Sequence, residues 1–492
     1  MFTRREFLKT TGTVILLPHM SVAHGGSEGV WVNDIHAQIN RTLVTRVLEV
    51  ASTEAVQEAI KTAESEGKPL SIAGGRHSMG AQQFGSDTIL IDTRKLNKVI
   101  GFDRERGIVE VQAGVQWPKL ISYLVNAQKK QSKQWGIAQK QTGADRLTLG
   151  GALAANIHGR GLTMRPFVSD VESFTMVDAN GRLRECSRHQ NKELFRLVAG
   201  GYGLFGFVTS IKLRLVTRRK LRRVVKTTHA NDLMDVFEKR ISEGFLYGDF
   251  QFNIDDQSEE FLLGGILSCY IPVDPSIPIP PHKKILSSRD WETLVRLAHT
   301  DKQKAFEKYI DHYLASSGQV YWSDTHQLSP YLDHYHRALD RESQSQSKAT
   351  EIITEIYVPR PKLIAFLKEV RDDFRKHGTN LIYGTIRLIE RDNESFLAWA
   401  RERYACIIFN LHTVHTPEEL NRSASAFLRL IDVAINHGGS YFLAYHKFAT
   451  RQQVLSCYPQ FPEFLNLKNR YDPEERFQSD WYRHYRNMFQ TN

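Results

Sequence analysis

A histidine follows closely after a pair of glycines at the end of a strand-like run. This is the first segment of the chain whose residue types and spacing could support chemistry. Residues 69–73 read as a short strand, and Gly74-Gly75-Arg76-His77-Ser78-Met79 follows it. Glycines at such a turn let backbone N–H groups approach a phosphate closely. The pattern is neither the Gly-x-Gly-x-x-Gly of Rossmann domains nor the phosphate loop of NTPases. Taken alone, it also fits a strand-to-turn junction with an incidental histidine.

A second segment combines small residues with a His-Gly turn. Residues 147–161 read Leu-Thr-Leu-Gly-Gly-Ala-Leu-Ala-Ala-Asn-Ile-His-Gly-Arg-Gly. A run of such small side chains allows a flat group or another backbone to lie against it. A tightly packed helix that ends at a capping residue explains the same composition. The two interpretations stay open for this segment alone.

The elements that must position both segments lie within residues 42–217. Helical spacing occurs at 56–63, and Asp178-Ala179-Asn180-Gly181 between two apolar runs indicates a tight turn. The strand-like runs are 69–73, 88–92, 108–112, 174–177 and 208–215. Glycine clusters lie at 74–75, 150–151, 159–161 and 200–206. This pattern predicts an α+β domain whose backbone approaches a ligand closely.

The character of the chain changes after the basic run 218–223, which we interpret as a strand or linker. Residues 224–440 have fewer glycine clusters and more aromatic residues, with helix-like stretches near 292–315 and 360–376. A strand-like run at 440–445 opens a charged, aromatic tail that continues to residue 492. The length of 492 residues indicates two to three domains.

The N-terminus has the features of an export signal. Arg4-Arg5 and Phe7-Leu8-Lys9 precede a short apolar stretch that ends at Leu17, and Ser21-Val22-Ala23 offers a cleavage site. Paired arginines of this kind are similar to the twin-arginine signal, which exports folded proteins. Residues 1–25 are therefore predicted to be a twin-arginine signal peptide, and the protein is expected to be periplasmic or exported. Past residue 25 we expect no transmembrane segment.

Composition excludes several other classes. The formal net charge of +10 is modest for this length, and no basic stripe interleaved with aromatic residues predicts nucleic-acid binding. The four cysteines are scattered and form no Cys-x-x-Cys pair, so neither a zinc ribbon nor a dithiol redox site is expected, and no metal site is predicted. Buried free thiols are the favoured interpretation.

The two glycine segments and Gly200-Gly201-Tyr202-Gly203-Leu204-Phe205-Gly206, in this order, resemble the FAD-binding domain of the vanillyl-alcohol oxidase/p-cresol methylhydroxylase superfamily. The resemblance is nearest to the alditol oxidase, sugar-lactone oxidase and decaprenylphosphoryl-ribose oxidase branches. It implies a PCMH-type FAD-binding domain at 42–217, an antiparallel-sheet substrate (cap) domain at 218–440, and a C-terminal segment, 441–492, that packs on the FAD domain.

The resemblance also implies which residues hold FAD. His77 stands where the alditol and lactone oxidases place the histidine that bonds covalently to the flavin, whereas the decaprenylphosphoryl-ribose branch lacks that histidine. The absence of a cysteine in 154–161 argues against a second, cysteinyl bond. The implied cofactor-binding residues are Ala73, Gly74, Gly75, Arg76, His77, Ser78, Met79, Gly143, Gly150, Gly151, Asn156, Ile157, His158, Gly159, Val208 and Lys447.

Two residues are the implied catalytic groups. Lys447 matches a lysine that these branches place at the flavin's N1/C2 edge, where positive charge stabilises the reduced cofactor. Arg387 lies in a segment similar to the arginine strand of the sugar-oxidase cap and would orient a substrate oxygen. His446 is a weaker choice for the base, since adjacent strand residues point to opposite faces.

The implied reaction is oxidation of an alcohol carbon on a sugar, polyol or sugar lactone, with a hydride passing to flavin N5. The electron acceptor is O2 or a quinone or cytochrome, and the sequence does not decide between them. A cell-envelope dehydrogenase of a lipid-linked sugar stays open, as does a non-catalytic exported binding protein that kept the fold.

Overall fold

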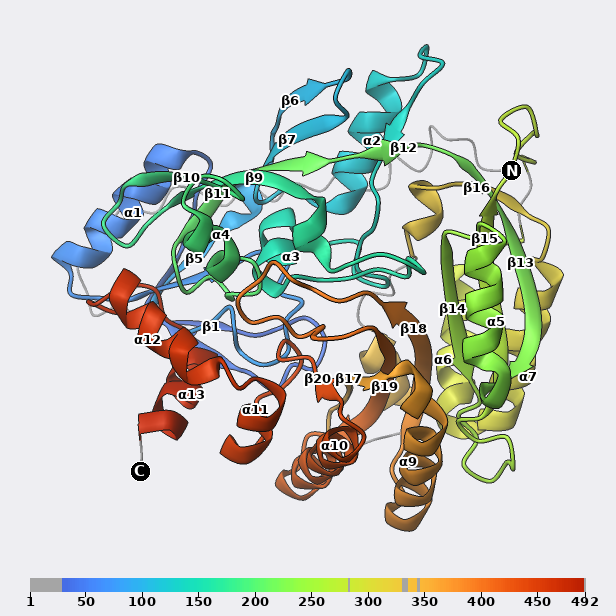
Figure 1. The fold of residues 1–492 in the computed structure, drawn as a ribbon. Helices are drawn as coiled ribbons and strands as arrows, with labels where there is room; N and C mark the ends of the chain where they lie inside the picture. The colour runs from blue at the N-terminus through green and yellow to red at the C-terminus, as the bar shows by residue number, and fades with distance from the viewer. Residues whose placement is uncertain (1–28, 282–283, 330–334, 343–345, 491–492) are drawn as a thin grey trace.

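The computed structural model describes residues 29–281, 284–329, 335–342 and 346–490, and Figure 1 shows their arrangement. The twin-arginine segment lies outside these residues, so export stays a prediction. Near the N-terminus, β3 (Arg46–Glu49), β5 (Ile89–Asp92) and β4 (Leu70–Ala73) form a parallel sheet. The helix α1 (Thr53–Ser65) crosses between β3 and β4. It begins at Ser52, whose side chain accepts from the Ala55 N–H, and one face buries Val56, Ala59, Ile60 and Ala63.

An antiparallel sheet of five strands adjoins this unit. Its order is β10 (Leu183–Ser187), β9 (Val171–Val177), β11 (Phe207–Arg214), β7 (Ile108–Gln112) and β6 (Val99–Asp103). The helices α2 (Trp117–Ala127), α3 (Leu149–Ala155) and α4 (Lys192–Val198) lie between its strands in sequence. A short two-stranded ladder, β8 (Trp135–Gly136) with β12 (Val216–Thr217), ends this half of the chain.

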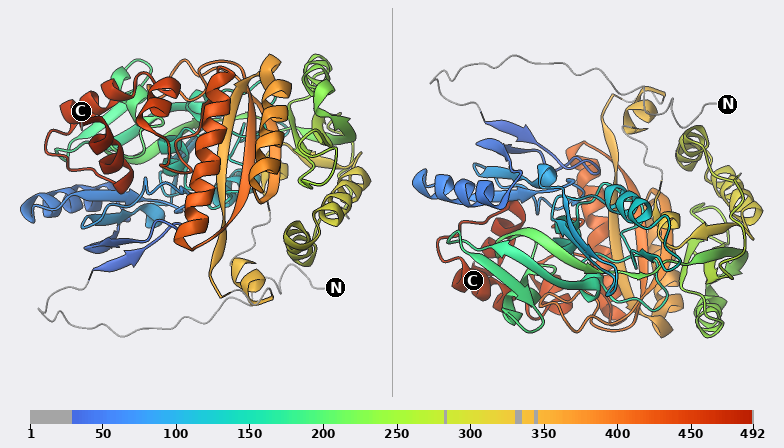
Figure 2. Two further views of the ribbon diagram at one scale, coloured as in Figure 1. Left: turned by 90° about the horizontal axis from the view of Figure 1, so that it is seen from below. Right: turned by 90° about the horizontal axis from the view of Figure 1, so that it is seen from above.

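The second half is built on an antiparallel sheet of eight strands. The order is β16 (Val320–Trp322), β13 (Lys220–His229), β15 (Gly264–Pro272), β14 (Tyr247–Phe252), β18 (Leu381–Ile389), β19 (Tyr404–Val414), β17 (Ala349–Pro359) and β20 (Ser440–Tyr441). The basic run 218–223 thus leads into β13. Figure 2 shows α9 (Leu363–His377) and α10 (Pro417–Asn436) on one face of this sheet and the N-terminal half toward the other.

Further helices flank the large sheet. The helix α5 (Ala230–Ser242) lies against β13 and β15. The stretch expected to be helical near 292–315 is two helices, α6 (Ser288–Thr300) and α7 (Lys302–Ala315), separated at Asp301. The Asp301 side chain accepts from the Lys304 N–H and so begins α7. The short helix α8 (Tyr335–Glu342) precedes β17.

The last segment of the chain returns to the N-terminal half. It contains α11 (Arg451–Cys457), α12 (Phe461–Tyr471) and α13 (Asp480–Gln490). The Leu70 N–H donates to the Arg476 carbonyl (2.7 Å) and the Gln478 N–H donates to the Leu70 carbonyl (2.8 Å), so this segment adds a bridge beside β4. The Asp480 carboxylate accepts from Ser86 N–H (2.8 Å) and Oγ (2.9 Å).

This mixture of helices with antiparallel sheets agrees with the expected α+β class. The domain limits at 217/218 and 440/441 stay a prediction, since β20 of the tail pairs with β17 while the helices that follow contact the N-terminal half. None of the helices in the described part of the chain combines the length and apolar character that a membrane span requires. All four cysteines are buried free thiols.

Candidate functional site

A cavity of about 630 Å³ lies between the two halves of the chain. The N-terminal half contributes the turn after β4 and the loop that precedes α3. The large sheet contributes β18 and β19, and α6 and α7 supply aromatic side chains. Among the residues expected to hold FAD or act in catalysis, those that line the cavity are His77, Ser78, Met79, Gly143, Ile157 and Arg387.

His77 reaches the cavity beside a second imidazole, His36. The His36 Nε2 and His77 Nδ1 atoms lie 2.8 Å apart, while His77 Nε2 makes no hydrogen bond within the described residues. Burial, the neighbouring His36 and the Lys140 cation hold the pKa of His77 well below its usual value. Burial also lowers the pKa of His36 to about 4. Both rings are therefore neutral near pH 7, and His77 is among the residues that line the cavity.

The glycine pair allows two backbone segments to meet. A Cβ at Gly74 would lie 2.2 Å from Thr148 Oγ1, and one at Gly75 would lie 2.3 Å from the Arg146 carbonyl oxygen. Thr148 in turn begins α3, where its side chain accepts from the Gly151 N–H (3.2 Å). The two glycine segments that the sequence singled out are thus in direct contact, and Gly150 packs on Ala113 in the same way.

The residues that end α3 are buried behind the cavity wall. Asn156 has a left-handed backbone (φ 46°) and caps the helix. Its side chain accepts from the Val168 N–H (2.9 Å) and donates to Asp392 Oδ2 (2.9 Å). These bonds tie α3 to the loop after β18. The side chain of Asn156 is consequently engaged within the protein.

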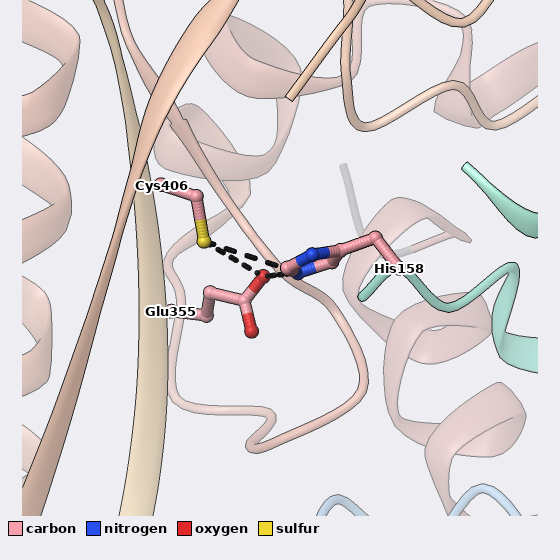
Figure 3. A group of neighbouring side chains, drawn as sticks. All are labelled: His158, Glu355 and Cys406. Atoms are coloured by element: carbon pink, nitrogen blue, oxygen red, sulfur yellow. Dashed lines mark hydrogen bonds and ion pairs between the residues drawn. The ribbon is translucent and has the colours of Figure 1, made fainter. Parts of the chain in front are cut away.

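His158 belongs to a buried polar cluster with Glu355 and Cys406, which Figure 3 shows. His158 Nε2 pairs with Glu355 Oε1, and Cys406 Sγ lies 3.3 Å from the same oxygen. The Tyr357 hydroxyl also donates to it (2.6 Å). Burial alone would raise the pKa of Glu355, but the charge and hydrogen bond of His158 and the bond from Tyr357 lower it overall. Glu355 is therefore a fully buried, ionised carboxylate.

Tyr445 and Arg387 connect this buried cluster to the cavity. The Tyr445 hydroxyl lies 3.4 Å from Glu355 Oε2 and 3.2 Å from Gln141 Nε2. Arg387 is only 3% exposed, and its Nε and Nη1 atoms have no hydrogen-bond partner among the described residues. An unpartnered buried guanidinium costs free energy unless a ligand supplies acceptors. The cavity is therefore lined by a cationic side chain, a tyrosine hydroxyl and a neutral imidazole.

Comparison with known proteins agrees with this geometry. Residues 44–187 match the family described as FAD binding domain. An uncharacterized oxidoreductase, ORF5 in the fasciation locus of Rhodococcoides fascians, is 29% identical over 43% of this chain and 46% of its own length. L-gulonolactone oxidase of Bos taurus is 25% identical over 39% of this chain and 42% of the enzyme. Cytokinin dehydrogenase 9 of Oryza sativa subsp. japonica is 22% identical over 87% of this chain and 82% of its own length.

Residues 44–187 are an FAD-binding domain, and the relatives are consistent with the predicted vanillyl-alcohol oxidase/p-cresol methylhydroxylase superfamily. The predicted family and cofactor are thereby confirmed. The alignments with the first two relatives span less than half the length of each relative.

The residues of this flavoprotein fit the cofactor. Gly143 has a positive φ of 78°, lines the cavity, and leaves open space where a Cβ would stand. The unpartnered His77 nitrogen and Arg387 guanidinium lie in the wall of the same cavity. Ala73, Gly74, Gly75 and Arg76 lead into it, and Gly150, Gly151 and Gly159 lie in the packed segments behind it. Val208 is half-buried in β11 and is not among the lining residues.

Lys447 of the flavoprotein is not among the residues that line the cavity. It lies beside Asp480 and His484 of α13, and burial lowers its pKa while Asp480 opposes that shift. The His446 ring stacks against Phe427 and Phe448, and its Nε2 lies 3.1 Å from Thr354 Oγ1. The structure therefore does not bring Lys447 together with Arg387.

Sequence reasoning missed three groups of the flavoprotein site. Tyr445 and Glu355 were not among the predicted site residues, although both belong to the polar chain that reaches the cavity. Lys140 is fully buried, with its ammonium 2.6 Å from Asp145 Oδ1. A Lys-x-x-x-x-Asp spacing in a loop carries little signal by itself, so only the fold reveals this pair.

Proposed function

We propose that this protein is an FAD-dependent oxidoreductase that oxidises an alcohol (CH–OH) carbon of a sugar, polyol or sugar lactone. The observation that carries the proposal is that Arg387 and Tyr445 share one cavity with His77. The name of one relative, L-gulonolactone oxidase, supports the substrate class. When bound, FAD supplies the acceptor for the hydride that leaves the alcohol carbon.

The protein's part in the reaction is to hold the alcohol oxygen and take its proton. Arg387 donates to that oxygen and fixes its position. Tyr445 takes the hydroxyl proton as its own proton passes to the Glu355–His158 pair, so the alcohol becomes a carbonyl after losing one hydride and one proton. Burial and the Glu355 carboxylate raise the pKa of Tyr445 well above its ordinary value, so Tyr445 is a relay and not a phenolate base.

We further propose that His77 bonds covalently to FAD. His77 would hold FAD through a bond from its imidazole to the flavin 8α carbon. That bond would replace a C–H bond, with the proton released to solvent and the two electrons passed to the external electron acceptor. Oxygen, a quinone or a cytochrome each serve as that acceptor within the proposal. Export through the twin-arginine route also remains part of the proposal, and a covalent bond would keep the cofactor in place after export.

A substrate panel on purified yellow protein tests the proposed activity. Alditols, sugar lactones and a lipid-linked pentose are mixed anaerobically with the protein, and bleaching of the flavin absorbance is followed. Cytokinin belongs in the panel because of the match to cytokinin dehydrogenase. Bleaching by a polyol or lactone is the expected result, and bleaching by cytokinin alone would refute the substrate class. Timing of reoxidation in air then separates an oxidase from a dehydrogenase. Colourless protein would instead favour the non-catalytic binding protein.

A further inference from the structure

Three imidazoles surround one buried carboxylate near one end of the large sheet, on the face that lines the cavity. Glu351 on β17 pairs in register with His412 on β19, while His299 of α6 and His336 of α8 approach from the flanking helices. The exposed fraction of the Glu351 side chain is 3%, and those of His336, His299 and His412 are 11%, 14% and 22%. The proposed oxidation uses none of these four residues.

The spacing of three ligand atoms matches a tetrahedral metal site. His299 Nε2 lies 3.2 Å from Glu351 Oε1 and 3.3 Å from His412 Nδ1, and the last two atoms are 3.5 Å apart. A tetrahedron with metal–ligand distances of about 2.0–2.1 Å has edges of about 3.3–3.4 Å. All three separations therefore agree with the edges of one tetrahedral face.

The neighbours of these atoms orient them as metal ligands are oriented. His299 Nδ1 lies 2.8 Å from the Val295 carbonyl oxygen and donates to it, which leaves Nε2 as the ring nitrogen that points into the cluster. His336 Nδ1 lies 2.8 Å from the other carboxylate oxygen of Glu351, Oε2, and holds that group in place. Such outer contacts fix tautomer and orientation in known metal sites.

We propose that His299, Glu351 and His412 bind a divalent transition-metal ion of the zinc type. Two imidazoles and one carboxylate suit zinc and its neighbours, whereas calcium and magnesium require mostly oxygen ligands. Three protein ligands leave the fourth position for water or another small ligand, and His336 is the positioning residue for the carboxylate.

The metal would fix one wall of the substrate cavity. Trp291, Val295 and His299 recur every four residues on one face of α6, and the first two line the cavity. On the sheet, Ile353 and Asn410 stand next to Glu351 and His412 on the same face and also line the cavity. A metal that joins α6 to β17 and β19 therefore holds the helix against the cavity.

Metal binding is measured on tag-free, full-length holoprotein after treatment with a chelator. Isothermal titration with Zn²⁺ should show one ion bound per chain, and Co²⁺ should give the intense visible absorption of a tetrahedral site. Zn²⁺ should also raise the unfolding temperature. His412→Ala should abolish the zinc titration signal and the tetrahedral cobalt absorption. His336→Ala should weaken zinc binding by about 10- to 100-fold.

His437→Ala is the matched control. His437 pairs with Glu369 at 2.9 Å on the other face of the same sheet, and no third metal-ligating side chain joins that pair within the described residues. This variant should bind zinc as the wild type does. The proposal fails if wild-type protein shows no saturable binding, if Co²⁺ gives only the pale spectrum of an octahedral ion, or if His412→Ala binds zinc with unchanged affinity. The flavin need not be reduced by any substrate for these readouts, so this result is independent of the proposed oxidation.

Discussion

Burial, together with the neighbouring His36, sets the protonation state of His77, the residue proposed to hold FAD. Both pKa values lie below the ordinary histidine value, so neither ring carries a charge near pH 7. A neutral ring retains a lone pair, and a nitrogen needs that lone pair to form a bond to carbon. Burial of the two imidazoles thus leaves His77 in the uncharged form that the proposed covalent bond requires.

Covalent attachment is tested by denaturing the protein in acid. Wild-type protein should keep its flavin on the polypeptide, and a tryptic peptide that contains His77 should carry the added mass. His77→Ala should release any flavin that it binds. Complete release of flavin by wild-type protein would contradict the bond and leave His77 as a residue of the glycine turn.

The roles of Arg387 and Lys447 can be separated by rapid kinetics. Arg387→Ala should slow anaerobic flavin reduction by about 10²–10³-fold, because it removes a preorganised donor from the cavity. Lys447→Ala should leave that rate unchanged, because Lys447 lies beside α13 and outside the cavity lining. Stopped-flow absorbance measures both rates. An equal loss in the two variants would favour the role at the flavin edge that the sequence predicted for Lys447.

The motif that contains Tyr445, His446 and Lys447 shows how the placement of side chains depends on where a strand ends. The sequence predicted a strand over 440–445. Alternate residues of a strand lie on opposite faces of the sheet, and this rule would decide which side chains of the motif point toward the cavity. The strand β20 ends at Tyr441, after which the chain leaves the sheet as a loop. Tyr445 then reaches the cavity, and Lys447 does not. Where the strand ends depends on the pairing of β20 with β17, which is a long-range contact.

At the scale of elements, the two glycine segments were correctly recognised as places of close approach. What the sequence did not specify is the partner, because glycine permits approach by a phosphate or by another backbone. The structure places Gly74 and Gly75 against Arg146 and Thr148. The split between α6 and α7 was also missed, since no proline or glycine marks it and Asp301 alone begins the second helix.

A double-mutant cycle tests the contact between the turn after β4 and the start of α3. Gly74→Ala should lower the free energy of unfolding by about 1–3 kcal/mol, because its Cβ meets Thr148 Oγ1. Thr148→Ala should cost about 1 kcal/mol through loss of the helix cap. The double variant should lose less unfolding free energy than the sum of the two single-variant losses, as measured by urea unfolding. Gly75→Ala serves as comparison, since Thr148→Ala cannot relieve its collision with the Arg146 carbonyl oxygen.

At the scale of the whole molecule, the tail joins the two halves and buries a histidine among aromatic rings. The His446 ring is 1% exposed, and burial lowers its pKa to about 3. Its ordinary value of about 6.5 applies in the unfolded chain. Between these values the unfolded chain binds the extra proton, so the folded state loses stability as pH falls from 6.5 toward 3.

Replacement of His446 should therefore make the free energy of unfolding vary less with pH below about 6.5. His446→Leu should make the unfolding free energy less dependent on pH between about 5.5 and 4.5, by up to about 1.4 kcal/mol per pH unit. Urea unfolding at several pH values measures the slope. The exposed His189 provides the control, because water solvates its ring in both states and His189→Leu should leave the slope unchanged. An unchanged slope in His446→Leu would show that the ring is protonated in the folded protein.

The bridge between Leu70 and Phe477 has a consequence for how the protein is made in the cell. During synthesis, β4 leaves the ribosome early, whereas Arg476 and Gln478, the backbone partners of Leu70, are translated roughly 400 residues later. Until then the outer edge of β4, immediately before the glycine turn, lacks these partners and can pair with a neighbouring nascent chain. A premature stop codon before residue 476 would leave that edge open permanently, although all of residues 44–187, which match the FAD-binding family, had been translated.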